Sequence, residues 1–442
     1  MVFAFIQRLW ATASSPAPEK KDDALRFGLV GASNIAPMAL IHPAKSHAEV
    51  VIAAVAARDR KKAETYAKKY SIPTVHDSYQ DILDDPSISA VYIALPNSHH
   101  YEWALKAVKA GKHVLLEKPS TSNADEARRL FRHPLVTAAD APVLLEAFHN
   151  KFHPAFQKFL SLIHTDPRAG PVKNAYVQQY LFKGYFGADD IRFNYKLAGG
   201  CLMDFGTYTV SALRQILRSR LDPVDVTYRP IPPTKKDVGD QSKVDQMVGA
   251  TYKAADGGAI GTMVADLASS GGFPAFLPAS WTMNWPSFGW PKAVVECAKK
   301  ELPSTDSRYK ATDEQIQTVQ RNVTMWNTLA LMNIYHRIDV ADTLELRKKT
   351  DGSLVKRWTE EKHYKIYKYR DDVDAPEEVR NRSGEDWWPT YRYMLEEFVN
   401  KVKGRPTSVW VDHEDSIDQM ETLDRTYEKM GLGVRPGSDF NL

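Results

Sequence analysis

The segment Val114-Leu115-Leu116-Glu117-Lys118-Pro119 carries the residue whose type and position best suit chemistry. Its apolar run predicts a buried strand that ends at the charged pair Glu117 and Lys118. In a parallel sheet the carboxyl ends of the strands face the ligand, and Pro119 keeps Lys118 in an extended conformation that aims its side chain. Lys118 is therefore the first candidate for a catalytic cation. The alternative is an ordinary surface ion pair between Lys118 and Glu117.

A second candidate set lies in the glycine-containing segment 199–208. Asp204 and Tyr208 are four residues apart, so they share one face of the helix predicted there. An acid and a phenol near a lysine form a proton-transfer set, because a nearby cation would lower the pKa of Tyr208 and favour proton exchange with a substrate hydroxyl. The alternative is a buried tyrosine that is hydrogen-bonded to an aspartate in an ordinary core.

A glycine-containing loop follows the first predicted strand. Its residues fit the pattern Gly-x-Gly-x-x-Ala, with Ser33 in the place of the second glycine. Such a loop makes a tight turn and presents a helix N-terminus to a pyrophosphate. A degenerate loop can also be a simple turn, but its position in a region of alternating strands and helices favours dinucleotide binding. The residues predicted to contact the cofactor here are Gly31, Ala32, Ser33, Asn34 and Ile35.

The end of the second predicted strand favours NADP over NAD. An NAD site normally places an acidic residue there to bind the ribose hydroxyls. Here the strand ends in alanines followed by Arg58 and Asp59. A guanidinium without a preceding carboxylate suits a 2′-phosphate. The alternative is that Asp59 binds the ribose and Arg58 is only its surface partner.

Further polar residues end the third and fourth predicted strands at the same ligand edge. Asn97 and His100 are candidates for contact with the nicotinamide ribose or the substrate, although Asn97 or Ser98 can also cap the following helix. The residues predicted to face the cofactor at this edge are Leu95, Pro96, Asn97, His100, Glu117 and Lys118.

The elements that must position these residues alternate between strand and helix over residues 25–150. Short strands that alternate with helices predict a doubly wound α/β domain, with a parallel sheet covered on both faces. Residues 1–24 precede it and are predicted to be a flexible tail. Strands are predicted at 27–30, 50–56, 90–95, 114–116 and 143–148, and helices at 63–70, 103–110 and 125–131.

The pattern changes in residues 151–442, which are predicted to form an α+β domain for substrate binding and oligomerisation. Longer strands at 174–182, 244–252 and 259–267, and a hairpin around 350–352, predict an antiparallel or mixed sheet. The tryptophan- and proline-rich residues 271–328 are irregular and are predicted to be an insertion. Two helices are predicted within 388–430.

Composition narrows the function classes. The chain has 442 residues, a net charge of +3 and two cysteines, Cys201 and Cys297. The nearly neutral charge gives no support for nucleic-acid binding. Two thiols cannot form a disulfide framework or a zinc cluster, so we expect a cytoplasmic location and no metal. No apolar run is long enough to cross a membrane, while an organelle-targeting function of the first residues stays open.

Together these segments resemble the glucose–fructose oxidoreductase/inositol dehydrogenase family (Gfo/Idh/MocA) from about Arg26 to Leu217. The most specific match is Glu117-Lys118-Pro119, and the segments 96–100 and 146–154 match as well. The resemblance implies a Rossmann domain followed by an α+β domain with a large open, mainly antiparallel sheet. It places the family's lysine at Lys118.

The residue at position 208 indicates a subgroup. Many members have histidine there, whereas Tyr208 is similar to the NADP-dependent D-xylose dehydrogenases and the dimeric dihydrodiol dehydrogenases. The resemblance implies an NADP(H)-dependent dehydrogenase that transfers a hydride between nicotinamide and a sugar or cyclic polyol. In that reaction Tyr208 takes the hydroxyl proton, Lys118 lowers the tyrosine pKa, and Asp204 orients the lysine or the substrate. The residues predicted to bind the substrate are His149, Asn150, Lys151, Asp204 and Tyr208.

Two other functions stay open. One is a non-catalytic regulator of the same fold that senses NADP, and the other is a relative that uses NAD to cleave glycosides. The combination of Lys118, Asp204 and Tyr208 favours the dehydrogenase. Because an open sheet has a face that must be covered, we also expect a homodimer or a dimer of dimers.

Overall fold

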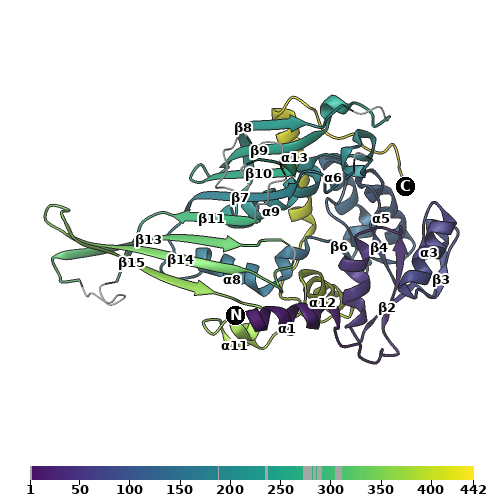
Figure 1. Cartoon of the computed structure of the whole chain (residues 1–442), viewed down its shortest axis with the longest axis horizontal. Coiled ribbons are helices and arrows are strands. Elements are labelled where there is room, and N and C mark those ends of the chain that lie inside the picture. The colour runs from purple at the N-terminus through teal and green to yellow at the C-terminus, as the bar shows by residue number, and fades with distance from the viewer. Residues whose placement is uncertain are drawn as a thin grey trace.

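The computed structural model describes residues 2–187, 189–233, 237–271, 281, 285, 291–303, 311–329 and 331–442. These residues form two sheets with helices packed against them, and the chain passes from the first sheet to the second near residue 150 (Figure 1).

The first sheet has six strands in the order β3-β2-β1-β4-β5-β6, and all neighbours are parallel. The strand order reverses between β1 and β4, which is where open parallel sheets of this type bind ligands. The strands are β1 (Leu25–Val30), β2 (Val50–Ala56), β3 (Thr74–Val75), β4 (Ala90–Ile93), β5 (His113–Leu116) and β6 (Leu144–Glu146).

The helices around this sheet begin at polar caps that the sequence supplies. Asp59, Ser78 and Asn123 accept backbone N–H groups at the starts of α3, α4 and α6, which satisfies donors that a helix N-terminus leaves free. The helices are η1 (Pro37–Ile41), α2 (His42–Lys45), α3 (Arg60–Tyr70), α4 (Tyr79–Asp84), η2 (Asn97–His99), α5 (His100–Lys109), α6 (Ala124–Phe131) and α7 (Pro134–Thr137). The predicted doubly wound domain is confirmed.

The second sheet has nine strands, eight of them in the order β15-β14-β13-β11-β7-β10-β9-β8, while the short β12 pairs with β13. Its neighbours are antiparallel except β7 and β10, so the expected mainly antiparallel sheet is confirmed. The strands are β7 (Val172–Phe182), β8 (Leu221–Pro230), β9 (Asp245–Ala254), β10 (Ile260–Ser269), β11 (Lys292–Cys297), β12 (Lys300–Leu302), β13 (Gln315–Trp326), β14 (Arg337–Lys348) and β15 (Leu354–Tyr364).

Helix α9 packs closely on this sheet. A Cβ atom at Gly261 of β10 would lie 2.9 Å from Cδ1 of Leu217, so only glycine allows this approach. The shorter elements on this side are η3 (His149–Phe152), η4 (Ile191–Phe193), η5 (Tyr195–Leu197), η6 (Leu202–Gly206), η7 (Gln241–Lys243), η8 (Tyr369–Asp371) and α11 (Glu377–Arg380). The longer helices are α8 (Pro154–His164), α9 (Thr207–Leu217), α12 (Thr390–Val402) and α13 (His413–Lys429).

The two C-terminal helices return to the first sheet. Phe398 of α12 packs on Phe27 of β1, with ring centroids 5.7 Å apart. Helix α13 bridges both parts, because it contacts α6 on one side and β8 and α9 on the other. The last third of the chain therefore helps to build the surroundings of the first sheet.

The expected flexible tail is wrong for its first half. Residues Val2–Ala13 form helix α1, which lies beside α11 and α12 in Figure 1. The Arg8 guanidinium lies 3.7 Å from the Tyr367 ring centroid, and the Thr12 hydroxyl donates to the Trp387 carbonyl at 3.3 Å. A helix this short is marginal alone, so contacts with residues more than 350 positions away stabilise it.

The expected irregular insertion at 271–328 is also wrong in part, because residues 292–326 supply β11, β12 and β13 of the large sheet. Burial alternates along β11 and β13, as in strands with one face on a core. The rest of the insertion, 272–280, 282–284, 286–290 and 304–310, lies outside the described residues. No helix in the described part of the chain is long and apolar enough to span a membrane.

Candidate active site

The structure brings Lys118 and Asp204 together from the two sheets. Lys118 follows the carboxyl end of β5, joined to Pro119 by a cis peptide bond, and its Nζ lies 2.7 Å from Oδ1 of Asp204 in η6. Both side chains are 11% exposed, so the pair is largely shielded from water and yet reachable. The alternative of a surface pair with Glu117 is wrong, because the partner of the ammonium group is Asp204.

Asp204 has a second cationic partner that the sequence analysis missed. Nε of Arg192 lies 2.6 Å from Oδ2 of Asp204, and Nη1 of Arg192 lies 2.9 Å from Oδ1 of Asp190. Burial alone would raise the pKa of Asp204, but the charges of Arg192 and Lys118 outweigh it and hold the pKa well below its usual range. Asp204 is therefore a fixed carboxylate. No spacing rule singles out Arg192, which lies in the short helix η4.

Tyr208 lies in the first turn of α9 and faces the same site. Its ring centroid lies 4.7 Å from Nζ of Lys118, and the phenol of Tyr391 lies close enough to affect its pKa. Burial raises the pKa of Tyr208 well above its usual value, and the phenol of Tyr391 and the carboxylate of Glu117 add to this. The expected lowering by Lys118 is wrong for this arrangement, because the ammonium group lies over the ring and pairs with Asp204.

Tyr391 and His149 complete the enclosure of Tyr208. The His149 ring stacks on Tyr391 with centroids 3.8 Å apart, and its Nδ1 lies 2.7 Å from the hydroxyl oxygen of Thr390. Burial lowers the pKa of His149, so its imidazole is neutral. His149 was a predicted substrate ligand, and the structure places it at the site. Tyr391 was missed because α12 brings it from almost two hundred residues further along the chain.

Glu117 lies beneath the site. Its Oε1 accepts a hydrogen bond from the Tyr92 hydroxyl at 2.6 Å, and burial raises the pKa of this carboxyl. Glu117 was predicted to contact the cofactor, but the hydrogen bond of its side chain is with Tyr92 of the neighbouring strand β4. Because β4 and β5 are neighbours, the bond ties the ends of the two strands together.

The loop after β1 has the features of a phosphate cradle. Gly31 has a φ of 105°, and a Cβ atom there would lie 3.0 Å from Cδ2 of Leu95 at the end of β4. Oγ of Ser33 accepts the Ala36 N–H at 3.2 Å, so the serine closes the turn. Among the described residues, no hydrogen bond is found for the backbone N–H groups at 33–35. Free amides after the first strand are the donors that a pyrophosphate requires.

The end of β2 separates Arg58 from Asp59. Oδ1 of Asp59 accepts the backbone N–H groups of Lys61 and Lys62 at 2.9 and 3.3 Å, so this carboxylate caps α3. The guanidinium of Arg58 is exposed and has no ion pair within the described ranges. The alternative requires an ion pair between Arg58 and Asp59, and none is found among the described residues.

The side chains of Asn97 and His100 contact backbone carbonyl groups of the protein. Nδ2 of Asn97 donates to the Ala198 carbonyl at 2.9 Å, so it joins the two halves of the site and does not cap a helix. The ring nitrogens of His100 lie 2.8 Å from the Pro119 carbonyl oxygen and 2.9 Å from that of Leu95. His100 is therefore a brace between two strand ends, and the prediction of a cofactor or substrate contact is wrong for its ring.

Two predicted substrate ligands have other partners. Nζ of Lys151 is buried and lies 2.6 Å from Oδ2 of Asp415 in α13, so an ion pair occupies this lysine, and its contact with a substrate stays a prediction. Nδ2 of Asn150 donates to the Thr328 carbonyl at 3.4 Å. Oδ1 of Asn150 is buried and has no partner among the described residues, so this oxygen is the part of the segment left for a ligand.

Comparison with known proteins finds a family that the first part of the chain is similar to. Residues 25–135 match the family model described as an oxidoreductase family with an NAD-binding Rossmann fold. Over 194 residues the chain is 40% identical to D-xylose 1-dehydrogenase (NADP(+)) 2 of Haloferax volcanii, covering 44% of this chain and 57% of that protein. It is 31% identical over 198 residues to mouse trans-1,2-dihydrobenzene-1,2-diol dehydrogenase, covering 44% and 56%. The chain thus matches little more than half the length of these relatives.

The fold has solved counterparts. A 3-ketoreductase from Actinomadura kijaniata, crystallised with NADP and TDP-benzene, superposes with a TM-score of 0.61 at 18% identity, covering 91% of this chain and 96% of that one. This likeness extends the shared fold to the second sheet. Residues 25–135, which contain the glycine loop and Glu117-Lys118-Pro119, are thus similar to the oxidoreductase family with an NAD-binding Rossmann fold.

Proposed function

We propose that this protein is an NADP-dependent oxidoreductase that transfers a hydride between nicotinamide and a CH–OH group of a sugar or cyclic polyol. The observation that carries the proposal is the 2.7 Å contact between Lys118 and Asp204, with Tyr208 beside it, at the carboxyl edge of a parallel sheet. A regulator that only senses the nucleotide has no need for this cross-sheet set.

The residues at the edge of the first sheet fit a dinucleotide. The free amides at 33–35 suit the pyrophosphate, and Gly31 provides the close approach. Arg58, which has no ion pair in the described part of the chain, suits a 2′-phosphate. When bound, NADP supplies or accepts the hydride at its nicotinamide ring.

The protein's own groups handle the proton and the charge. Tyr208 holds a proton on its hydroxyl and exchanges it with the reacting oxygen of the substrate. Lys118 places a positive charge beside that oxygen and stabilises negative charge that develops on it. Asp204 fixes the direction of the ammonium group, and Arg192 fixes Asp204 from the other side.

The substrate class rests on the relatives. One is named a D-xylose dehydrogenase that uses NADP and another a dehydrogenase of a cyclic diol. Oδ1 of Asn150, which is buried and has no hydrogen-bond partner among the described residues, suits a ligand with several hydroxyls. The glycosidase-type relative has no observation here that favours it, so a sugar or cyclic polyol dehydrogenase is the proposal.

We also propose a homodimer, or a dimer of dimers, in a cytoplasmic location. The outer strand β15 is exposed along most of its length, as an open sheet awaiting a partner would be. Both cysteines are free and buried, which suits a reducing compartment. Light scattering that shows a monomer at micromolar concentration would contradict the dimer.

The Lys118→Ala and Tyr208→Phe variants test the catalytic roles. Each should lower kcat for NADP-linked sugar oxidation by at least about 100-fold, because each removes charge or proton handling at the reacting oxygen. NADPH binding, followed by fluorescence, should change little. The exposed Lys109 and Tyr185 provide the matched controls Lys109→Ala and Tyr185→Phe. Full activity in both site variants, or release of sugar from an aryl glycoside without NADPH formation, would refute the proposal.

Arg58→Ala tests the choice of nucleotide. Loss of a charge-assisted hydrogen bond to a phosphate should raise KM for NADP by about 10- to 100-fold. KM for NAD should stay nearly constant, because NAD lacks the 2′-phosphate. Arg60→Ala, in the neighbouring first turn of α3, is the control. Equal effects of Arg58→Ala on the two nucleotides would contradict the assignment.

A further inference from the structure

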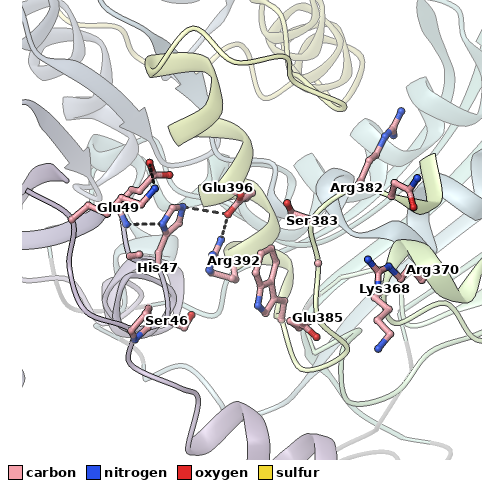
Figure 2. A pocket seen from close by; sticks show the side chains of 16 residues that line it. Ser46, His47, Glu49, Lys368, Arg370, Arg382, Ser383, Glu385, Arg392 and Glu396 are labelled. Atoms are coloured by element: carbon pink, nitrogen blue, oxygen red, sulfur yellow. Dashed lines mark hydrogen bonds and ion pairs between the residues drawn. The ribbon is translucent and has the colours of Figure 1, made fainter. Parts of the chain in front are cut away.

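A polar cavity lies apart from the candidate active site. It has a volume of about 490 Å³, and Figure 2 shows the residues that line it. Its walls come from residues 46–49, which precede β2, from the loops at 368–370 and 381–385, and from α12. The glycine loop follows the carboxyl end of β1, whereas residues 46–49 lead into the amino end of the parallel β2. The two sites therefore lie at opposite edges of the first sheet.

One wall of this cavity is already balanced in charge. Oε2 of Glu396 lies 2.7 Å from Nη1 of Arg392 and 3.3 Å from Nε2 of His47 (Figure 2). Glu49 receives Lys21, Lys403 and Arg405 at 3.2, 3.1 and 2.8 Å. The acidic groups on this side are thus neutralised by cations from the protein itself.

The facing wall has an excess of positive charge. Lys368, Arg370 and Arg382 lie together across the view in Figure 2. None of the three forms an ion pair with another residue in the described ranges, and the one acidic lining residue on this side is Glu385. Asn381 and Ser383 add neutral hydrogen-bonding groups to the same wall. Such a wall attracts an anion and can donate several hydrogen bonds to it.

Arg392 gives an independent sign of a ligand. Its side chain is 5% exposed, and its guanidinium carbon lies 3.8 Å from the centroid of the Trp388 ring, which also lines the cavity. Nη1 pairs with Glu396, but Nε is buried and has no hydrogen-bond partner among the residues that the structure describes. Buried donors without a partner are uncommon because each loses its hydration without a replacement.

We propose that this cavity binds a small anion that carries phosphate, such as a phosphate ester of a metabolite. Arginine presents paired donors that match phosphate geometry, and two arginines and a lysine share the unpaired wall. The volume lies within the range of small-molecule sites, and the Trp388 ring offers an apolar surface to the organic part of an ester. The site does not depend on the proposed dehydrogenase activity.

Calorimetry on the full chain tests this site with sodium pyrophosphate as the probe. The unchanged protein should bind pyrophosphate saturably, and Arg370→Ala/Arg382→Ala should weaken binding at least tenfold. Arg357→Ala/Lys253→Ala, at exposed positions of the large sheet, removes the same charge and should leave the affinity within about twofold. Arg370→Lys/Arg382→Lys keeps the charge, so its affinity for pyrophosphate should lie between that of the unchanged protein and that of Arg370→Ala/Arg382→Ala. Melting temperatures check that each variant is folded.

Several outcomes would overturn the proposal. Equal weakening by the two double alanine variants would show unspecific attraction to a basic surface. Loss of pyrophosphate binding in Arg58→Ala, with Arg370→Ala/Arg382→Ala unaffected, would place the probe at the nucleotide site instead. Citrate that binds tighter than pyrophosphate would contradict the phosphate class. Absence of saturable binding to the unchanged protein would also refute it.

Discussion

At the scale of single residues, the site is organised around one carboxylate. Asp204 accepts Lys118 on one oxygen and Arg192 on the other, at 2.7 and 2.6 Å. Lys118 and Arg192 are both held in place by this buried carboxylate. If either side chain moved away, part of the charge of Asp204 would be left without a counter-charge in a poorly hydrated place. The ammonium group is thereby kept over Tyr208, beside the position of the reacting oxygen in the proposed reaction.

The raised pKa of Tyr208 predicts how the two directions of the reaction depend on pH. Burial keeps the phenol protonated at neutral pH, so donation to a carbonyl needs no prior ionisation, whereas oxidation of a hydroxyl needs the rare phenolate. The phenolate fraction rises tenfold per pH unit below the pKa. We therefore expect kcat/KM for oxidation to rise with pH up to about pH 10 without a plateau, while reduction stays flat between about pH 6 and 9.

Steady-state kinetics of the unchanged protein and Tyr208→Phe measure this dependence. The phenylalanine variant should lose the slope in its residual oxidation rate, because it has no group that ionises there. A plateau near pH 7 in the unchanged protein would mean that bound ligands lower the tyrosine pKa far below its value in this structure.

At the scale of elements, side-chain hydrogen bonds join the carboxyl ends of the neighbouring strands β4 and β5. Tyr92 of β4 donates to Glu117 after β5, and His100 of α5 contacts the carbonyls of Leu95 and Pro119. The carbonyl groups of Leu95 and Pro119 belong to the loops that follow β4 and β5, and the second of these loops carries Lys118. The ligand edge is therefore held by side chains behind it, which leaves its front free.

His100→Ala should destabilise the fold by about 1–3 kcal/mol, because the neutral imidazole donates one buried hydrogen bond to a strand-end carbonyl and fills the space between the two carbonyls. Urea unfolding followed by circular dichroism measures the free energy of unfolding. The neighbouring His99→Ala is the control, since His99 is only half-buried and should stay within about 0.5 kcal/mol of the unchanged protein. Equal effects of the two variants would show that His100 does not brace the strand ends.

At the scale of the whole molecule, the end of the chain fastens the second half of the site. Arg435 is fully buried, with Nη2 at 2.8 Å from Oδ1 of Asp245 and Nε donating to the Gly199 carbonyl at 2.7 Å. The other oxygen of Asp245 accepts the Leu202 N–H at 2.6 Å, at the start of the helix that carries Asp204. Arg435 and Asp245 thus hold the segment that leads into η6, which carries Asp204.

Arg435→Ala should destabilise the protein by about 3–5 kcal/mol, because it leaves the buried carboxylate of Asp245 without its counter-charge. Differential scanning calorimetry should show the lower melting temperature. Arg357→Ala removes a 63% exposed arginine on β15 and should leave the melting temperature nearly unchanged. A neutral outcome for Arg435→Ala would mean that the C-terminal segment does not hold the 199–202 loop.

Local sequence determined the parallel sheet and the loops at its ligand edge. Apolar strands, helix caps and the turn at Gly31 depend on neighbours in the chain, so their pattern can be read directly. The same holds for Lys118, Asp204 and Tyr208, whose residue types and local spacing single them out. The hairpin strands of the second sheet were also predictable, because each pairs with a near neighbour.

Only the tertiary structure decided what those residues touch. Arg192, Tyr391 and Thr390 reach the site from loops and helices with no spacing rule to link them to it. Lys151 and His100 have the right types for ligands, but contacts with distant backbone and with α13 use their polar groups. A pairing across hundreds of residues depends on how the elements pack, and a sequence pattern records only what lies within a few residues along the chain.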